Sequence, residues 1–172
     1  MNPRLEGIFR RRSIRAYQER DVDDAVVRDL LEAAMAAPSA VSCDPWRFVV
    51  VRERKMLSDI AARLPSGGML TQAPAGLVVC GDLSAAHDRQ LSFLLQDCSA
   101  AIENLLVAAS MLGLGACWLG VHPREDRIRH VTRVLGLPKQ VIPVAAIALG
   151  WPAEQKPPRT RFDETKVHHD RW

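Results

Sequence analysis

The sequence lacks an excess of charge of either sign. Its 23 Lys and Arg residues are interspersed with 20 Asp and Glu residues, which leaves a formal net charge of +3. Dedicated nucleic-acid binders carry a one-sided basic excess. The composition therefore disfavours a nucleic-acid partner.

Long apolar runs and secretion signals are also missing. We find no hydrophobic run of about 18 uncharged residues, the length that a membrane-spanning helix requires. Charged residues interrupt the apolar positions at the N-terminus, unlike the pattern of a signal peptide. We expect a cytoplasmic protein that does not contact a membrane.

Cysteine is scarce and scattered. The four cysteines Cys43, Cys80, Cys98 and Cys117 form no C-x-x-C pair, which disfavours a zinc site or a redox dithiol. The five histidines show no ligand spacing either, so we expect no metal site. Three of the thiols lie in strongly apolar surroundings and should be buried, and Cys43 alone is expected to be accessible.

Hydrophobic residues are not scarce, since they make up 48% of the chain, which is enough for the core of a single domain over 1–172. Apolar periodicity predicts helices over 5–9, 23–35, 55–64, 91–112 and 124–135, and strands over 46–51, 76–80, 113–120 and 141–149. The arginines of the helix over 124–135 should point into solvent. The element order predicts an α+β fold with a mainly antiparallel sheet flanked by helices.

Two elements carry further expectations. The strand over 46–51 is continuously apolar from Phe48 to Val51, which favours an interior position in the sheet. The helix over 91–112 is apolar on nearly all sides, so it is buried either centrally in a lone domain or between its own sheet and a partner subunit.

The last segment, 150–172, cannot form a core of its own. It has little apolar periodicity, and Pro157 and Pro158 favour an extended conformation. It is either disordered or an arm that packs on another surface. Its tryptophans, Trp151 and Trp172, favour the arm.

Three guanidinium groups and a hydroxyl gather near the start of the chain, in Arg11, Arg12, Ser13 and Arg15. Arg suits phosphate binding because its planar fork donates paired hydrogen bonds to phosphate oxygens. A solvated basic turn and a nucleic-acid contact are the alternatives that these residues alone leave open.

A glycine-rich stretch over 113–120 marks either a tight turn or a close backbone approach to something flat or phosphorylated. Its spacing is not G-x-G-x-x-G, and it follows a helix rather than a strand. We therefore do not expect a Rossmann fold.

Four blocks of the chain together resemble the nitroreductase family of flavin mononucleotide (FMN) enzymes. They are Arg11-Arg12-Ser13-Ile14-Arg15, then Ala37-Pro38-Ser39 with Pro45-Trp46, then the stretch 113–120, and finally Gly150-Trp151-Pro152 followed by Arg159 and Arg161. The resemblance implies a homodimer that exchanges the arm over 150–172 and carries two flavin sites at its interface.

The same resemblance assigns expected roles near the phosphate. Arg11, Arg12 and Ser13 would hold the phosphate and ribityl end of FMN, and Arg159 and Arg161 would form a second phosphate clamp. Arg15 would lie toward the N1/O2 edge of the flavin, where a fixed cation stabilises the negative charge of the reduced ring.

The resemblance implies two further groups of flavin contacts. The loop residues Pro38, Ser39, Ala40 and Ser42 would reach the flavin bound mainly by the other subunit. The backbone of Trp118, Leu119 and Gly120 would lie near flavin N5. Ser42 and Asp44 stand where many family members have Asn and Gln, which bears on the choice of acceptor.

The implied activity is oxidoreduction with NADH or NADPH as reductant and a nitroaromatic, a quinone or a similar small molecule as acceptor, with ping-pong kinetics. The chain has little inserted between Val51 and Gly76, so we expect an open, promiscuous pocket. The alternatives are a flavin-dependent dehydrogenase or desaturase of a specific metabolite and a non-catalytic FMN-binding sensor.

Overall fold

A single antiparallel sheet forms the centre of the computed structural model, which describes residues 2–172. Its strands are β1 (Trp46–Val51), β2 (Ala75–Asp82), β3 (Gly115–Gly120) and β4 (Val141–Gly150), in the spatial order β1-β2-β4-β3. All three strand pairs are antiparallel, which confirms the predicted α+β fold.

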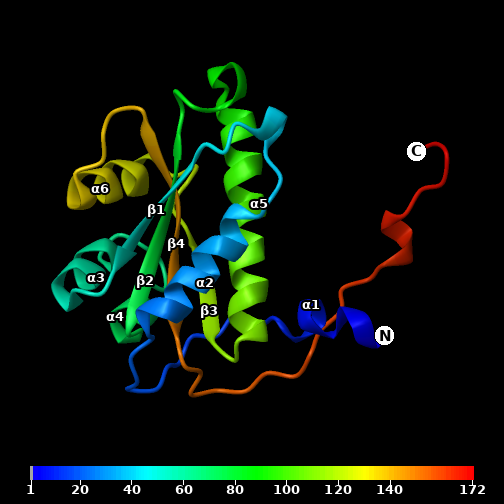
Figure 1. The fold of residues 1–172 in the computed structure, drawn as a ribbon, viewed down its shortest axis with the longest axis horizontal. Helices are drawn as coiled ribbons and strands as arrows, with labels where there is room; N and C mark the ends of the chain where they lie inside the picture. Colours follow the sequence, from blue (N-terminus) through cyan, green and yellow to red (C-terminus); the bar gives the residue numbers. More distant parts are fainter. Residues whose placement is uncertain (1) are drawn as a thin grey trace.

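Helices cover both faces of the sheet (Figure 1). One core lies between the sheet and the helices α2 (Asp24–Met35) and α5 (Leu91–Met111). The other lies between the sheet and α3 (Arg54–Ala61), α4 (Gly68–Gln72) and α6 (Glu125–Leu135). The short helix α1 (Glu6–Arg10) contacts α5.

The predicted interior position of β1 is wrong, because this strand forms one edge of the sheet. Trp46 and Val51 are buried, but Val50 is 39% exposed and one backbone edge of the strand has no neighbour among the described residues. The apolar pattern arose because helices cover both faces of the strand. It carried no information on how many strands lie beside it.

The ends of α2 and α6 differ in how well they match common capping signals. Asp23 precedes α2, although its side chain makes no capping hydrogen bond, and Gly136 ends α6 in a left-handed conformation with φ of 62°. The helix predicted over 55–64 ends at Ala61, and the glycine-containing break after it holds the unpredicted helix α4.

The helix α5 has the length and hydropathy of a membrane span, but in this fold it is a core helix. It packs against α2 and the sheet. Asp97 is among its buried residues, while Met111 at its C-terminal end is 72% exposed.

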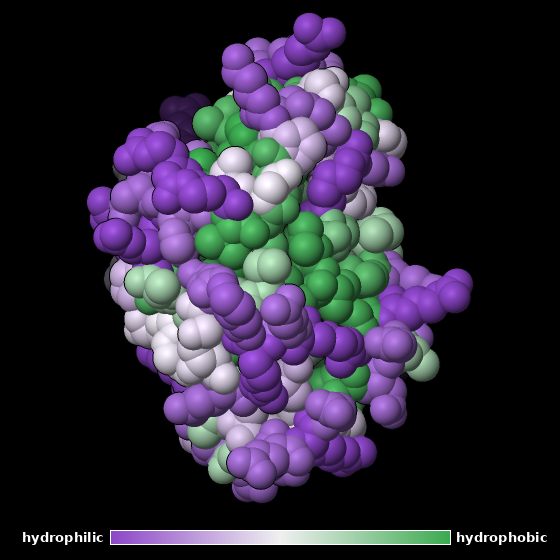
Figure 2. Space-filling view, turned by 90° about the vertical axis from the view of Figure 1, so that its left-hand side faces the viewer, coloured by the Kyte–Doolittle hydropathy of each residue, from purple (hydrophilic) through white to green (hydrophobic). Residues whose placement is uncertain are grey.

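The surface is not uniformly hydrophilic. Figure 2 shows a band of hydrophobic side chains between hydrophilic ones on the side of the molecule where Figure 1 labels α3 and α6.

Burial raises the pKa of the Cys80 and Cys98 thiols to about 12, and Cys117 is also buried. Cys43, which was expected to be accessible, is half-buried and is the least buried of the four thiols.

Candidate functional site

The basic segment, which runs from Arg11 to Arg15, is fixed against the edge strand β3. The Ile14 N–H donates to the Ala116 carbonyl at 3.1 Å, and Ser13 forms an isolated parallel bridge with Ala116. Three residues after Ile14, the Tyr17 hydroxyl donates to the Ile14 carbonyl at 2.7 Å. Burial raises the pKa of Tyr17 well above its usual value, so the hydroxyl stays a donor. Ile14 is thereby held through both of its backbone groups.

Gly115 allows this contact because it has no side chain. A Cβ atom at Gly115 would lie 2.6 Å from Cγ2 of Ile14, closer than packed carbon atoms approach each other. The glycine therefore lets the buried Ile14 lie directly on the strand. Arg12 and Ser13, which precede it, are positioned by the same contact.

The first part of the C-terminal segment closes over the basic segment. The Lys156 ammonium donates to the Ser13 carbonyl at 2.7 Å, and Arg12 donates to the Pro157 carbonyl. The Arg159 N–H donates to the Phe9 carbonyl at 3.0 Å. This part of the predicted arm thus packs on its own chain. The rest extends away from the body in Figure 1, and its Phe162 and Trp172 are exposed.

Glu154 also links the basic segment to the C-terminal segment, and its two hydrogen bonds are called the Glu154 clamp below. Its Oε1 atom accepts from the Arg15 N–H at 2.6 Å and from the Lys156 ammonium at 2.8 Å. These hydrogen bonds, that from Lys156 first, hold the pKa of Glu154 below its usual value. Glu154 and Lys156 were not predicted, because a Glu–Lys pair two residues apart in a tail has no distinctive pattern.

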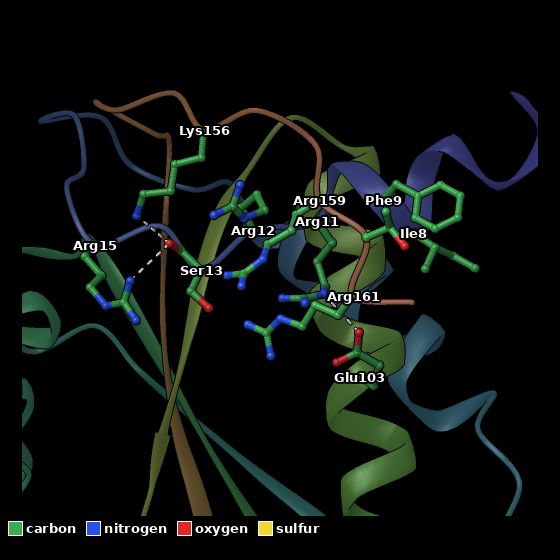
Figure 3. Close-up of a pocket in the computed structure, with 11 residues that line it drawn as sticks. Ile8, Phe9, Arg11, Arg12, Ser13, Arg15, Glu103, Lys156, Arg159 and Arg161 are labelled. Carbon is green, nitrogen blue, oxygen red and sulfur yellow. Dashed lines mark hydrogen bonds and ion pairs between the residues drawn. The ribbon is translucent and has the colours of Figure 1, made fainter. Parts of the chain in front are cut away.

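The two segments together enclose a cavity of about 470 Å³ (Figure 3). Six predicted residues, from opposite ends of the chain, line it: Arg11, Arg12, Ser13, Arg15, Arg159 and Arg161. Lys156 and Glu103 line it as well. The cavity therefore brings five guanidinium groups and one ammonium group beside a single carboxylate.

Several of these cations are available to a ligand. Arg11 forms an ion pair with Glu103, in which Nε and Oε1 lie 3.0 Å apart. The guanidinium groups of Arg159 and Arg161 make no hydrogen bond or ion pair within residues 2–172. A cluster of partly unpaired guanidinium groups suits a phosphate dianion, which can accept several charge-assisted hydrogen bonds.

The other predicted contacts do not line this cavity. Trp118, Leu119 and Gly120 continue β3 beyond the residue that pairs with Ser13. Trp118 is 37% exposed, whereas Leu119 is buried. The loop residues Pro38, Ser39, Ala40 and Ser42 follow α2 at another place on the surface.

That loop is held in an unusual backbone conformation. Val41, Ser42 and Asp44 have φ angles of 50°, 56° and 49°, in the left-handed region that a β-branched residue rarely adopts. The Ala40 N–H donates to Oδ1 of the buried Asp97 at 2.9 Å, while Oδ2 has no partner within the described residues. Strain of this kind persists where the surrounding structure fixes it, often at functional sites.

One expectation about α6 needs correction. The arginines of this helix were predicted to be merely solvated, but the Arg127 guanidinium donates through Nη1 to the Gly120 carbonyl at 2.8 Å. Its long side chain reaches back from the helix to β3. Arg127 therefore contacts one of the predicted flavin neighbours, and Arg133, which is exposed, is a better example of a solvated arginine.

Comparison with known proteins identifies relatives of this chain. The model of the nitroreductase family matches residues 8–151. A protein of Methanothermobacter thermautotrophicus is 46% identical over 168 residues, which cover 98% of this chain and 87% of the relative. It carries the provisional name NADH dehydrogenase/NAD(P)H nitroreductase.

Solved structures agree with the fold. A crystal structure from Parabacteroides distasonis, with the same provisional name, has a TM-score of 0.93 and 38% identity, and the match covers 100% of both chains. A provisionally named nitroreductase from Desulfovibrio desulfuricans, in complex with FMN, has a TM-score of 0.84 and 32% identity. That match covers 100% of this chain and 99% of the other.

Replacing Gly115 with Ala should displace Ile14 and the basic segment that it carries. We expect the Gly115→Ala variant to lose about 1–3 kcal/mol of unfolding free energy, as overpacked cores do, and to bind inorganic pyrophosphate more weakly. Gly68→Ala is the matched control, because nothing lies within 4 Å of a Cβ atom at Gly68. Urea denaturation and calorimetric titration measure both quantities. Equal behaviour of the two variants would contradict the role of Gly115.

The Glu154 clamp should open in acid. Because the pKa of Glu154 is lowered in the fold, its contribution is complete above the ordinary pKa of 4.5 and is lost as the pH falls through the lowered value. The NMR shift of the Arg15 amide should therefore titrate with a midpoint below 4.5, and Glu154→Gln should abolish this step. A midpoint above 4.5, or an unchanged titration in the variant, would argue against the clamp.

Proposed function

The chain belongs to the nitroreductase family, and we propose that it is an FMN-dependent oxidoreductase that passes hydride from NADH or NADPH to a nitroaromatic, a quinone or a similar small acceptor. One observation carries this proposal. The basic segment and the C-terminal segment, about 145 residues apart, form one cationic cavity in a chain that matches an FMN-containing relative over its whole length.

The residues of the cavity fit the phosphate of FMN. Arg11 and Arg12 come from the basic segment, and Arg159 and Arg161 come from the C-terminal segment, two residues apart on an extended stretch. We assign these four and Ser13 to the phosphate and ribityl end. Their guanidinium forks match phosphate oxygens, and the phosphate charge would relieve the mutual repulsion of the cluster.

Arg15 lies away from this phosphate cluster. Figure 3 shows Arg15 and Lys156 directed at the Ser13 carbonyl, on the opposite side of Ser13 from Arg159 and Arg161. This separation supports a role for Arg15 at the flavin ring. Bound FMN supplies the hydride-accepting N5 atom, and a fixed cation near N1 and O2 stabilises the charge of its reduced form.

The surroundings of the site support an open pocket. Only α3 and α4 lie between β1 and β2, so the chain has no insertion there that could cover a bound flavin. A reductant and an acceptor that use the same exposed flavin face must bind in turn. We therefore propose ping-pong kinetics, with the backbone of Trp118, Leu119 and Gly120 beside N5.

We also propose that the active unit is a homodimer. Exposed apolar side chains remain at the end of α5, in Met111 and Leu112, and along the C-terminal segment, in Phe162 and Trp172. A second copy that exchanges the part of the arm beyond Arg161 would cover them, and the loop with Pro38, Ser39, Ala40 and Ser42 would then reach the other subunit's flavin. Free thiols and a nicotinamide reductant fit a cytoplasmic enzyme.

Sedimentation equilibrium tests the assembly. At micromolar concentration we expect about twice the chain mass of 19.1 kDa, and truncation after Arg161 should shift the protein toward monomer because it removes the exposed apolar arm. A full-length chain that sediments as a monomer at this concentration would contradict the dimer.

Flavin binding and reduction test the function. We expect a yellow protein whose visible spectrum bleaches anaerobically with NADH or NADPH and recovers when a nitroaromatic or quinone is added. A protein that stays colourless after FMN is added and the excess removed would refute the proposal. Reduction by an organic substrate but not by NAD(P)H would favour a dehydrogenase, and a yellow protein with no turnover would favour a sensor.

Three arginine variants separate the assigned roles. Arg11→Ala should raise the Kd for FMN about tenfold or more, because a hydrogen bond to a charged group contributes about 1.5–3 kcal/mol. Arg15→Ala should chiefly slow flavin reduction and lower the flavin potential. Arg133→Ala on α6 should change neither property. Equal effects at all three positions would undermine the assignment.

A further inference from the structure

Glu103 is the one carboxylate that lines the cationic cavity, and the family assignment gives it no role. It projects from α5 toward the guanidinium group of Arg11 (Figure 3). The side chains of Glu103 and Arg11 are 52% and 31% exposed. Burial therefore does not force the two together, and the pairing reflects their own attraction.

The atoms in contact define what this pairing does to Arg11. Oε1 of Glu103 lies 3.0 Å from Nε of Arg11, and no other hydrogen bond or ion pair of the Arg11 guanidinium occurs within residues 2–172. A guanidinium has five N–H donors in a rigid planar fork, of which Nε carries one. The contact at Nε therefore fixes the plane of the group and leaves the four N–H donors of Nη1 and Nη2 unused.

We propose that Glu103 is a positioning residue that holds the Arg11 guanidinium so that its two terminal nitrogens face the phosphate of FMN. This inference rests on the proposed function. Glu103 does not touch the phosphate and acts through Arg11. A bidentate contact through the two terminal nitrogens needs an oriented fork, and an exposed arginine without a second partner would have to lose its side-chain freedom when the phosphate binds.

The opposite effect, in which Glu103 competes with the phosphate for Arg11, is disfavoured by the geometry. Competition requires the carboxylate to occupy the terminal nitrogens, and it occupies Nε. The cavity also keeps a cationic excess without Arg11, from Arg12, Arg15, Lys156 and the two tail arginines. One solvent-exposed carboxylate does not cancel that excess.

Two substitutions separate orientation from charge. Glu103→Gln removes the charge but keeps a side-chain oxygen that can accept from Arg11 Nε, whereas Glu103→Ala removes both. Calorimetric titration of the flavin-free dimer should give Glu103→Gln an FMN Kd within about twofold of the wild type. Glu103→Ala should raise the Kd about three- to fivefold, the range of an exposed ion pair.

Riboflavin and a second glutamate serve as controls. Riboflavin has no phosphate, so its affinity should be the same in the wild type and both Glu103 variants. Glu32 pairs with Arg28 through the same atoms at the same 3.0 Å distance, on α2. Glu32→Ala should leave FMN binding unchanged, and its Tm should match that of Glu103→Ala within roughly 2 °C. Arg11→Ala combined with Glu103→Ala should bind FMN no more weakly than Arg11→Ala alone.

Specific outcomes would overturn the proposal. Tighter FMN binding by both Glu103 variants would show competition rather than positioning. An unchanged FMN Kd in Glu103→Ala, or an equal loss of riboflavin and FMN affinity, would remove the role of Glu103 and leave the proposed function intact. A wild-type chain that binds no FMN would refute the proposed function and this role together.

Discussion

Mutual repulsion among six cations is the constraint on which the site depends. Five arginines and Lys156 line a cavity of about 470 Å³. Like charges that lie close together without partners repel one another, which destabilises the folded site. The fold offsets this with backbone hydrogen bonds that do not depend on charge, from Ile14 to β3 and from Arg159 to Phe9. It adds two carboxylates, Glu103 and Glu154, each paired with one cation of the cavity. The remaining cations favour a bound anion, which connects the stability of the site to its function.

The edge strand β3 fixes the position of the basic segment. Gly115 lets Ile14 lie against the strand, and Tyr17 holds the Ile14 carbonyl from the other side. The C-terminal segment then crosses the basic segment and contributes Lys156 and Arg159. A site built in this way needs the two ends of the chain, so it forms only when the sheet between them has folded.

The sequence predicted the parts of the site that depend on residue type. The arginines near the start of the chain left a phosphate site as one of three alternatives, and four short blocks in the right order identified the family, which the comparisons confirm. The α+β architecture followed from element order and is confirmed. The loop contacts across a dimer interface stay a prediction, because the described chain is a single copy.

The parts that the sequence missed depend on tertiary contacts with no local pattern. Glu103 is one of several polar residues on a mostly apolar helix, and nothing in its spacing indicates that it meets Arg11. Arg127 belongs to a polar helix face, yet its side chain is long enough to reach Gly120. The edge position of β1 was missed because apolar periodicity reports which faces are covered and not which neighbours a strand has.

The most direct test of the central claim is a crystal structure of the protein with FMN. The account predicts that the phosphate lies between Arg11 and the pair Arg159 and Arg161, with Arg15 at the N1/O2 edge of the ring and the backbone of β3 beside N5. A flavin phosphate bound outside the cavity formed by the basic and C-terminal segments would contradict it.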